Sequence, residues 1–473
     1  MDIAAQHRTA HAAYDPQYDP LVARTPGEGL DYAPTYWVAT AGPPPEDDGP
    51  IRGDVDVDVA IVGSGFTGLA TALFLAREHG IRAVVLEANR SAWGCTSRNG
   101  GQGQNASGRL YRSQWIARWG KETALKLDAE IRKGFETFKG LVAEIPECEP
   151  QPGGHLYTAH REKKMAFLRN EAKVMREVFG YDTHILSADE VKRRYVNDAE
   201  AFGALHEPDG IGVHPLRLAY GYLRRARALG AKVHPASPVI GFETRGGVHH
   251  LRTPGGTVRA RAVGFATGGY TSNGLHRSLD SKIMPILSNS LVTRPLTRAE
   301  LEATNFLTTE VITDTRTLRF YYRRLPDNRV QIGSRSSITG ADAPNPAHMR
   351  VLVNGLARKF PALADIPIDY SWWGWVDVSH DMMPRITQPD PRESVFYALG
   401  YGGNGVSFSA HAGRRMAQRI AGRRDDAFEL PIYRSPLEYP NVFNAVRSRA
   451  FAPFRRFGQR FLYRWYYLRD EVL

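Results

Sequence analysis

The sequence predicts an α/β protein of two domains. One domain is expected to have a mainly parallel sheet that carries a small β-meander, and the other to be α+β with a mostly antiparallel sheet. Three observations lead to this prediction. A strand–turn–helix–strand unit occupies 54–87, three short strand-like runs with glycine turns occupy 233–269, and a strand-rich stretch at 286–335 follows long helical patterns. With 473 residues, the chain is long enough for two or three domains.

Composition narrows the class of protein. Apolar residues make up 42% and charged residues 23%, which excludes a mostly disordered chain. No run of eighteen apolar residues occurs and the N-terminus lacks the apolar region of a secretory signal, so we expect a cytoplasmic protein without a membrane-spanning helix. The two cysteines, Cys95 and Cys148, form no CxxC pair, and we predict neither a disulfide framework nor a metal site.

The first unit carries a dinucleotide-binding motif. Residues 54–62 alternate and then become continuously apolar, as in a strand that enters a buried parallel sheet. The turn GSGFTG follows (63–68), leading into a predicted helix over 66–78, and a second strand over 82–87 ends at Glu87. The three glycines permit a tight turn, a close approach of backbone to a pyrophosphate, and close packing of helix on strand, while the acid suits ribose hydroxyls. This spacing predicts a dinucleotide but does not separate NAD from FAD.

Two further segments favour FAD. The loop GCTSRNGGQ (94–102) offers small and hydrogen-bonding side chains soon after the ribose acid. A second strand–glycine turn–helix pattern spans 397–422, where the glycines are Gly400, Gly402, Gly403 and Gly405. A reduced flavin is negative at its N1/C2=O edge, and the positive N-terminus of a helix stabilises that charge. Nicotinamide needs no such device.

The predicted domain organisation is discontinuous. We expect an extended N-terminal arm at 1–49, a dinucleotide-binding domain made of 50–110, 205–285 and 375–425, a substrate domain made of 111–204 and 286–374, and a basic aromatic C-terminal tail at 426–473. A helix is predicted over 215–230, because the segment opens with proline and closes with glycine. The turns at 246–247 and 254–256 make the meander antiparallel.

Several segments together resemble a known family. YW at 36–37, LEANRSAWGCTSRNGGQ, GVHPLRLAYGYLRRA, FATGGYT, FYYRRLPDNRVQIGSR and GYGGNGV occur in that order. They are similar to the FAD-dependent amine and amino-acid oxidoreductases of the D-amino-acid oxidase superfamily, and most resemble its gamma-glutamylputrescine oxidase-like branch. The resemblance covers about 35–425. It implies a Rossmann-type FAD-binding domain.

The glycine turns and the resemblance together give the expected flavin site. Its residues are Gly63, Ser64, Gly65, Phe66, Thr67, Gly68, Glu87, Ala88, Cys95, Thr96, Ser97, Asn99, Gly100, Gly101, Gln102, Val239, Ala266, Thr267, Gly268, Gly402, Gly403, Asn404, Gly405 and Val406. Two departures concern a covalent flavin. Cys95 and Thr96 stand at the second and third positions of a loop that usually reads GASGRNGGQ, and Gly374 falls where the monomeric sarcosine oxidase branch keeps its flavin-linking cysteine. We therefore expect non-covalent FAD.

The resemblance implies oxidation of a C–N bond in a small-molecule amine or amino acid. Hydride would pass to flavin N5, water would hydrolyse the imine, and O2 would be the acceptor. Candidate substrate-side residues are His380, Tyr321, Tyr322, His214 and Trp373. The two tyrosines alternate on a strand, so only one of them can face the flavin. Core packing is the competing interpretation for the other tyrosine and for the tryptophan.

The basic C-terminal tail leaves alternatives open. Residues 445–471 interleave arginines with aromatic side chains in a chain of net charge +11. The favoured interpretation is a helix that clasps the body with its arginines paired to acids; docking on a membrane surface is the second, and nucleic-acid binding is unlikely. Two alternative functions follow, a dehydrogenase of the same fold that passes electrons to a membrane quinone, and a flavin-dependent RNA-binding or RNA-modifying protein.

Overall fold

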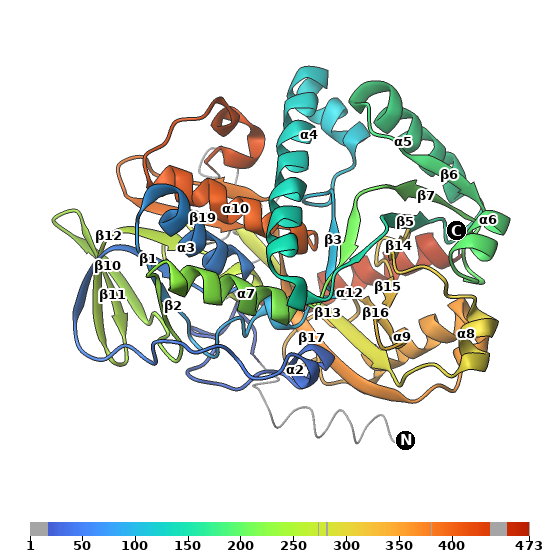
Figure 1. The fold of residues 1–473 in the computed structure, drawn as a ribbon, viewed down its shortest axis with the longest axis horizontal. Helices are drawn as coiled ribbons and strands as arrows, with labels where there is room; N and C mark the ends of the chain where they lie inside the picture. The colour runs from blue at the N-terminus through green and yellow to red at the C-terminus, as the bar shows by residue number, and fades with distance from the viewer. Residues whose placement is uncertain (1–17, 273, 281, 380, 436–451, 473) are drawn as a thin grey trace.

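The computed structural model describes residues 18–272, 274–280, 282–379, 381–435 and 452–472, without the side chains of 452–456. Two large sheets form the two halves of the molecule (Figure 1). The first sheet lies on the left of the figure behind helices α3 and α7, the second lies on the right, and the long helix α4 stands near the middle. The expected α/β class with two sheet-based units is confirmed.

The first sheet is a parallel core with a meander on one side. Its strands follow the order β10-β11-β12-β1-β2-β9, with β19 paired to β12 and β18 to β19. Their bounds are β1 Val55–Val62, β2 Val84–Leu86, β9 Lys232–His234, β10 Gly241–Arg245, β11 Val248–Thr253, β12 Gly256–Phe265, β18 Arg385–Thr387 and β19 Val395–Leu399. β1 pairs in parallel with β12 and β2, whereas β10, β11 and β12 are antiparallel. Both the parallel sheet and the meander were predicted by the sequence.

Three helices cover this sheet. They are α3 (Phe66–His79), α7 (Pro215–Ala228) and α10 (Gly405–Ile420). α3 is apolar around most of its circumference because it is enclosed by β1, α7 and α10, and its residues from Phe66 to Leu75 are all buried. It ends at Gly80, whose φ of +67° gives the left-handed conformation common after a helix. α7 begins at Pro215, as the sequence predicts.

The second sheet is almost wholly antiparallel. Its order is β17-β13-β16-β15-β14-β5-β7-β6, and only β14 and β5 run parallel. The strands are β5 His155–Thr158, β6 His184–Ser187, β7 Gly203–Glu207, β13 Ile283–Thr293, β14 Val311–Asp314, β15 Tyr321–Arg324, β16 Val330–Ser334 and β17 Ile368–Ser379. A small third sheet joins β3 (Gln102–Gln104), β8 (Gly210–Gly212) and β4 (Gln151–Pro152). Five further helices are α4 Arg112–Glu144, α5 Lys164–Phe179, α6 Ala188–Arg194, α8 Arg298–Thr304 and α9 Pro346–Lys359.

The structure differs from the sequence prediction at three places. The expected N-terminal arm contains a short helix, α2 (Tyr36–Thr40), because Trp37 is buried and donates from its indole nitrogen to the Asn99 carbonyl at 2.7 Å. β7 lies in the second sheet, as do residues 375–379 of β17, although the predicted ranges put 205–207 and 375–379 in the first domain. The domain boundaries themselves stay a prediction.

The C-terminal segment continues beyond α10. Helix α12 (Ala452–Tyr467) is followed by a single π-helical turn, Leu468–Val472. Figure 1 draws α12 behind the second sheet, with the C-terminus beside β5 and β14. Among the described residues, no helix has both the length and the apolar character needed to cross a bilayer.

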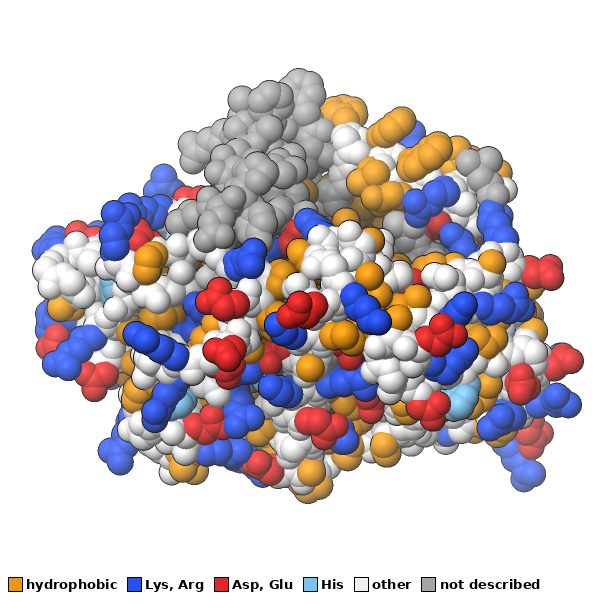
Figure 2. Space-filling view, turned by 90° about the horizontal axis from the view of Figure 1, so that it is seen from above, with side chains coloured by type: hydrophobic (Ala, Val, Ile, Leu, Met, Phe, Trp, Pro, Cys, Tyr) orange, Lys and Arg blue, Asp and Glu red, His pale blue; other side chains and the backbone are white. Residues whose placement is uncertain are grey.

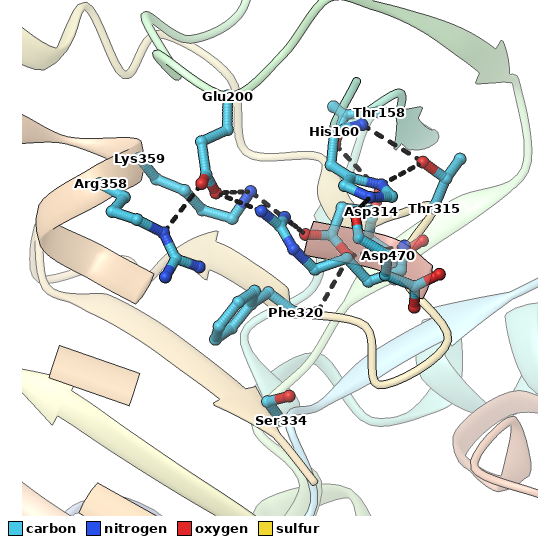
Figure 3. Close-up of polar contacts among 12 residues, drawn as sticks. Thr158, His160, Glu200, Asp314, Thr315, Phe320, Ser334, Arg358, Lys359 and Asp470 are labelled. Atoms are coloured by element: carbon cyan, nitrogen blue, oxygen red, sulfur yellow. Dashed lines mark hydrogen bonds and ion pairs between the residues drawn. The ribbon is translucent and has the colours of Figure 1, made fainter. Parts of the chain in front are cut away.

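A buried ion cluster ties this segment to the second sheet (Figure 3). The cluster comprises Asp198, Glu200, Asp314, Arg316, Lys359 and Glu471. The Lys359 side chain is 0% exposed, and its Nζ lies 3.2 Å from an oxygen of Asp198 and 3.3 Å from one of Asp314. Arg316 joins the same Asp314 carboxylate at 2.5 Å. Buried charges of this kind are tolerated only while each has its partners.

We predict that Lys359→Met destabilises the fold by about 3–5 kcal/mol, because it leaves buried carboxylates without their cation. The control is Lys126→Met on α4, where the lysine is 65% exposed and pairs with Glu122, and where a change within about 0.5 kcal/mol is expected. Urea unfolding followed by circular dichroism measures both values. Equal midpoints for the two variants would show that the cluster contributes no stability.

Candidate active site

A cavity of about 330 Å³ joins the two sheets. Its walls come from the β1–α3 turn, the loop at 93–102, residues 266–270 after β12, and the turn at 401–406 before α10. The second sheet and its helices contribute Tyr157, Thr313, Tyr321 and other side chains. One end is therefore surrounded by glycine turns and helix N-termini, and the other by side chains of the second sheet.

The β1–α3 turn has the shape of a phosphate cradle. Gly63 has a φ of +100°, and a Cβ there would lie 2.7 Å from the Ala266 carbonyl oxygen. A Cβ on Gly68 would lie 1.9 Å from the Gly63 oxygen, so the helix approaches the turn as closely as backbone allows. Gly65 caps α3 without a side-chain hydrogen bond and faces the cavity. The first backbone N–H groups of α3 thus form a site suited to an anion.

Glu87 is fixed at the end of β2, where it lines the cavity. Its Oε2 accepts hydrogen bonds from the Ser64 backbone nitrogen at 2.9 Å and from the Ser64 hydroxyl at 2.8 Å, and its Oε1 accepts one from the Asn89 nitrogen at 3.1 Å. Burial raises the pKa of this carboxyl, and these hydrogen bonds oppose the rise. The geometry suits an acceptor for ribose hydroxyls.

The loop at 94–102 closes over the cradle. Thr96 Oγ1 accepts from the Phe66 nitrogen at 3.1 Å, which ties the loop to the start of α3. Asn99 is engaged within the loop, since its amide donates to the Cys95 and Thr96 carbonyls and accepts from the Gly101 nitrogen. Burial raises the pKa of Cys95 to about 12, so its thiol stays protonated.

The second glycine turn places the N-terminus of α10 at the cavity. Gly400, Gly402 and Gly403 all have positive φ, and Asn404 donates to the Gly108 carbonyl at 2.6 Å. Asp377 of β17 fixes the turn, because its carboxylate accepts from the Gly400 nitrogen at 2.5 Å. Burial raises the pKa of Asp377. Asp377 is not among the site residues predicted from the sequence.

Most of the predicted flavin residues line this cavity. The exceptions are Ser64, Gly68, Ser97 and Gly101. These four support the walls instead. Ser97 donates to the Trp93 carbonyl at 2.8 Å, and a Cβ on Gly101 would meet the Val213 oxygen at 2.2 Å. Their assignment, like that of the lining residues, stays a prediction about the bound cofactor.

The two tyrosines of β15 separate as their alternation predicts. Tyr321 lines the cavity, and its hydroxyl lies 3.0 Å from Ser290 Oγ and 3.1 Å from Ser288 Oγ. Tyr322 points into the core of the second domain, where it donates to Asp198. Tyr322 is therefore not a cavity residue, because the pleat of the strand turns it to the opposite face.

Two other candidates are also outside the cavity lining. His214 caps α7, where Nδ1 accepts from the Arg217 nitrogen at 3.2 Å and Nε2 lies 3.0 Å from Thr40 Oγ1. Burial lowers its pKa to about 3, so it stays neutral. Trp373 is buried in a hydrophobic cluster with Trp93, Tyr270 and Trp375. This position agrees with the competing interpretation, in which the tryptophan packs in the core. His380 lies outside the described residues.

Three arginines that the sequence analysis did not select meet at the cavity. Arg109, Arg319 and Arg335 come from segments before α4, before β15 and after β16. Arg109 and Arg335 both donate to the Gly402 carbonyl, at 3.4 and 3.2 Å, and Arg319 donates to the Tyr111 hydroxyl at 3.5 Å. Burial, and then the charges of Arg335 and Arg319, lower the pKa of Arg109. We call these three residues the arginine cluster.

The site fits an FAD molecule. Gly65 leaves open space at the cradle, because a Cβ at this position would lie only 3.0 Å from Thr96 Oγ1. The cavity lining also includes Glu87 and the residues at the start of α10. Gln102 Nε2 and Ser409 Oγ are among the side-chain atoms of lining residues that are buried with no hydrogen-bond partner among the described residues. A dinucleotide cradle that leads to a second helix N-terminus, with a side-chain-lined chamber beyond it, defines a flavin-dependent oxidoreductase.

Comparisons with known proteins agree with this class. Residues 58–419 match the family described as "FAD dependent oxidoreductase" (DAO), and the chain belongs to this family. It is 32% identical to gamma-glutamylputrescine oxidoreductase of Escherichia coli K12 over 81% of this chain and 88% of that protein. It is 29% identical to the probable oxidoreductase OrdL of Haemophilus influenzae over 82% and 87% of the two chains. Among solved structures, glycine oxidase from Geobacillus kaustophilus shares the fold, with a TM-score of 0.69 and 21% identity over 80% of this chain and 98% of that one. The expected family, enzyme class and FAD cofactor are confirmed.

We predict that Gly65→Val lowers the flavin content of the purified protein at least tenfold, because the side chain fills the cradle at the first turn of α3. Absorbance near 450 nm, relative to protein, measures the loss. Gly140→Val on α4 is the control, since a Cβ there meets nothing within 4 Å. Far-UV circular dichroism of both variants shows whether the fold is retained. A folded Gly65→Val protein with full flavin content contradicts the assignment.

Proposed function

We propose that this enzyme oxidises the C–N bond of a small amine that carries a carboxylate, with O2 as electron acceptor. The names of its relatives support the amine class, because they include gamma-glutamylputrescine oxidoreductase, sarcosine oxidase subunit beta and glycine oxidase. The arginine cluster is the observation that supports a carboxylate on the substrate.

The arginine cluster has the positive charge needed to bind an anion. None of Arg109, Arg319 and Arg335 forms an ion pair with an acidic side chain in the part of the chain that the structure describes. Burial lowers the pKa of Arg335, and the charge of Arg319 lowers it further. Like charges brought together in a buried site are costly unless an anion joins them. A substrate carboxylate supplies that anion and is matched by the fork of a guanidinium.

The remaining side chains orient the substrate and limit water. Burial raises the pKa of Tyr321 above its ordinary value of 10, so its hydroxyl stays protonated and available as a donor. A Cβ on Gly403 would lie 2.9 Å from an Arg335 nitrogen, so the cluster lies beside the turn that begins α10. Trp115, Met175 and Leu205 give the opposite end apolar walls. FAD, when bound, supplies the hydride acceptor at N5 and leaves an imine for water to hydrolyse.

Non-covalent attachment of FAD is part of the proposal. Gly374 lines the cavity and offers no sulfur, and the thiol of Cys95, with its raised pKa, is a poor nucleophile. The same fold with a membrane quinone as acceptor is the alternative. The test below therefore compares the two acceptors.

The first experiment is a visible spectrum of the purified holoenzyme during anaerobic additions of amines and D- and L-amino acids. We expect the band near 450 nm to bleach with one carboxylate-bearing amine, and oxygen to restore it. Acid precipitation beforehand should leave the flavin in the supernatant. Restoration by a quinone but not by oxygen would favour the dehydrogenase, and flavin that no amine or amino acid reduces would contradict the proposed reaction.

We predict that Arg335→Gln raises KM for the carboxylate-bearing substrate and lowers its kcat/KM by roughly 30- to 150-fold, the effect of losing about 2–3 kcal/mol of a buried charge contact. An amine without a carboxylate is the internal control, because its kcat/KM should change little. Arg298→Gln, on the surface of α8, is the matched variant and should behave like wild type. Equal losses for both substrates would mean that Arg335 acts on the flavin and not on the carboxylate.

A further inference from the structure

We propose that the outer face of helix α12 docks on an anionic lipid surface. This face presents Phe457, Phe461, Trp465 and Leu468, which are 72%, 75%, 47% and 41% exposed. Steps of four, four and three residues put these side chains on one side of a helix. A helix on a water-exposed surface ordinarily turns such residues inward, so this arrangement leaves an apolar surface uncovered among the described residues.

The charges around this face select the partner. From 452 to 469 the chain contains five arginines, at 455, 456, 460, 464 and 469, and no acidic residue. Arg460, Arg464 and Arg469 are exposed, and by helical spacing they lie beside the aromatic face. Arg460 also pairs with Asp342 at 3.6 Å and Arg469 with the adjacent Asp470 at 3.4 Å, and both arginine side chains stay exposed in these pairs. Aromatic side chains at the level of lipid headgroups, with basic side chains beside them, are the composition of an interfacial helix. Anionic headgroups supply the complementary charge.

The inner face of α12 is partly buried against the rest of the protein. Gln459, Tyr463 and Tyr466 are half-buried, and Gln459 Nε2 donates to the Tyr463 hydroxyl at 3.0 Å. Burial raises the pKa of Tyr463, and the charges of Arg335 and Arg109 oppose this rise. The helix therefore has one half-buried face, and the opposite face is exposed.

The C-terminal end of the helix is fixed to the second domain by hydrogen bonds and an ion pair. Thr317 donates from its backbone nitrogen to the Asp470 carboxylate at 2.6 Å, and His160 Nε2 lies 3.0 Å from the Asp470 carbonyl oxygen. Glu471 pairs with Arg316 of the buried ion cluster. Figure 3 shows Asp470 among His160, Thr315 and Asp314. Because these contacts fix α12 to the second domain, docking of its outer face would orient the whole enzyme on the lipid surface.

A second copy of the chain fits this face less well than lipid does. A two-fold interface would bring two copies of this patch together, and so place the flanking arginines of one copy near those of the other.

Elsewhere the charges are mixed: over the lower part of Figure 2, basic and acidic side chains are interspersed, while at the upper right edge hydrophobic side chains gather with basic ones. The inference is independent of the substrate proposed above.

The test is sedimentation of the full-length holoenzyme with vesicles. We expect binding to phosphatidylcholine vesicles that contain phosphatidylglycerol, weak binding to phosphatidylcholine alone, and loss of binding as salt rises. The triple variant Phe457→Ser, Phe461→Ser, Trp465→Ser should bind at least tenfold more weakly. The control triple variant Val22→Ser, Phe202→Ser, Leu307→Ser changes three exposed apolar residues away from α12 and should bind as wild type does. Vesicle-free amine oxidation should be unchanged in both.

Two further measurements separate the possible occupants. Arg460→Gln with Arg464→Gln should weaken binding about tenfold without changing the secondary structure. Lipids brominated on the acyl chain should quench tryptophan fluorescence in the wild type more than in Trp465→Phe. Equal binding of the triple variant, or equal binding to neutral vesicles, overturns the proposal. A dimer seen by analytical ultracentrifugation and lost in the triple variant would assign the face to a second copy instead.

Discussion

The close approach of two backbone segments at the β1–α3 turn is the constraint on which the rest of the site depends. The Gly63 nitrogen donates to the Leu86 carbonyl, and the Ala266 nitrogen donates to the Val62 carbonyl, each at 2.8 Å. The turn is thereby held between β2 and β12, with no space for a Cβ at Gly63. This packing leaves the N–H groups at the start of α3 directed at one point and brings 266–268 to the same wall of the cavity. Each other part of the cradle is positioned relative to this turn.

The two domains contribute opposite kinds of chemistry to one cavity. The first domain supplies backbone: glycine turns, helix N-termini and a carboxylate already engaged by Ser64. The second supplies side chains of its antiparallel sheet and its connections, among them Tyr321, Arg319 and Arg335. Fixed backbone suits a constant cofactor, whereas side chains can be exchanged to suit a substrate. The division explains why the cofactor is far easier to assign than the substrate.

Features that depend on residues close together in the sequence were predicted, and features that depend on residues far apart in the sequence were not. The βαβ unit and α7 rest on local patterns, and their bounds were predicted to within about two residues. The meander was predicted as well, but the first of its three runs is divided between β9, which pairs in parallel with β2, and β10. The glycine turns are local too, so most of the residues predicted from them line the cavity. The arginine cluster was missed, because Arg109, Arg319 and Arg335 lie in separate segments that only the tertiary fold brings together. His214 was a substrate-side candidate, but its ring caps α7 by accepting from the Arg217 nitrogen, and this capping explains a histidine at that position.

The order of the strands has a consequence for synthesis of the protein. β1 receives its neighbour β12 only after about two hundred residues have intervened, and β19 joins β12 much later still, pairing Val395 with Val263. Pairings so distant along the chain form slowly, and a ribosome adds roughly 5–20 residues each second. The turn before α10 leaves the ribosome after nearly all of the catalytic domains have been made. Completion of the cavity is therefore a late event in synthesis, and the part of β12 that pairs with β19 stays unpaired until residues 395–397 have been made.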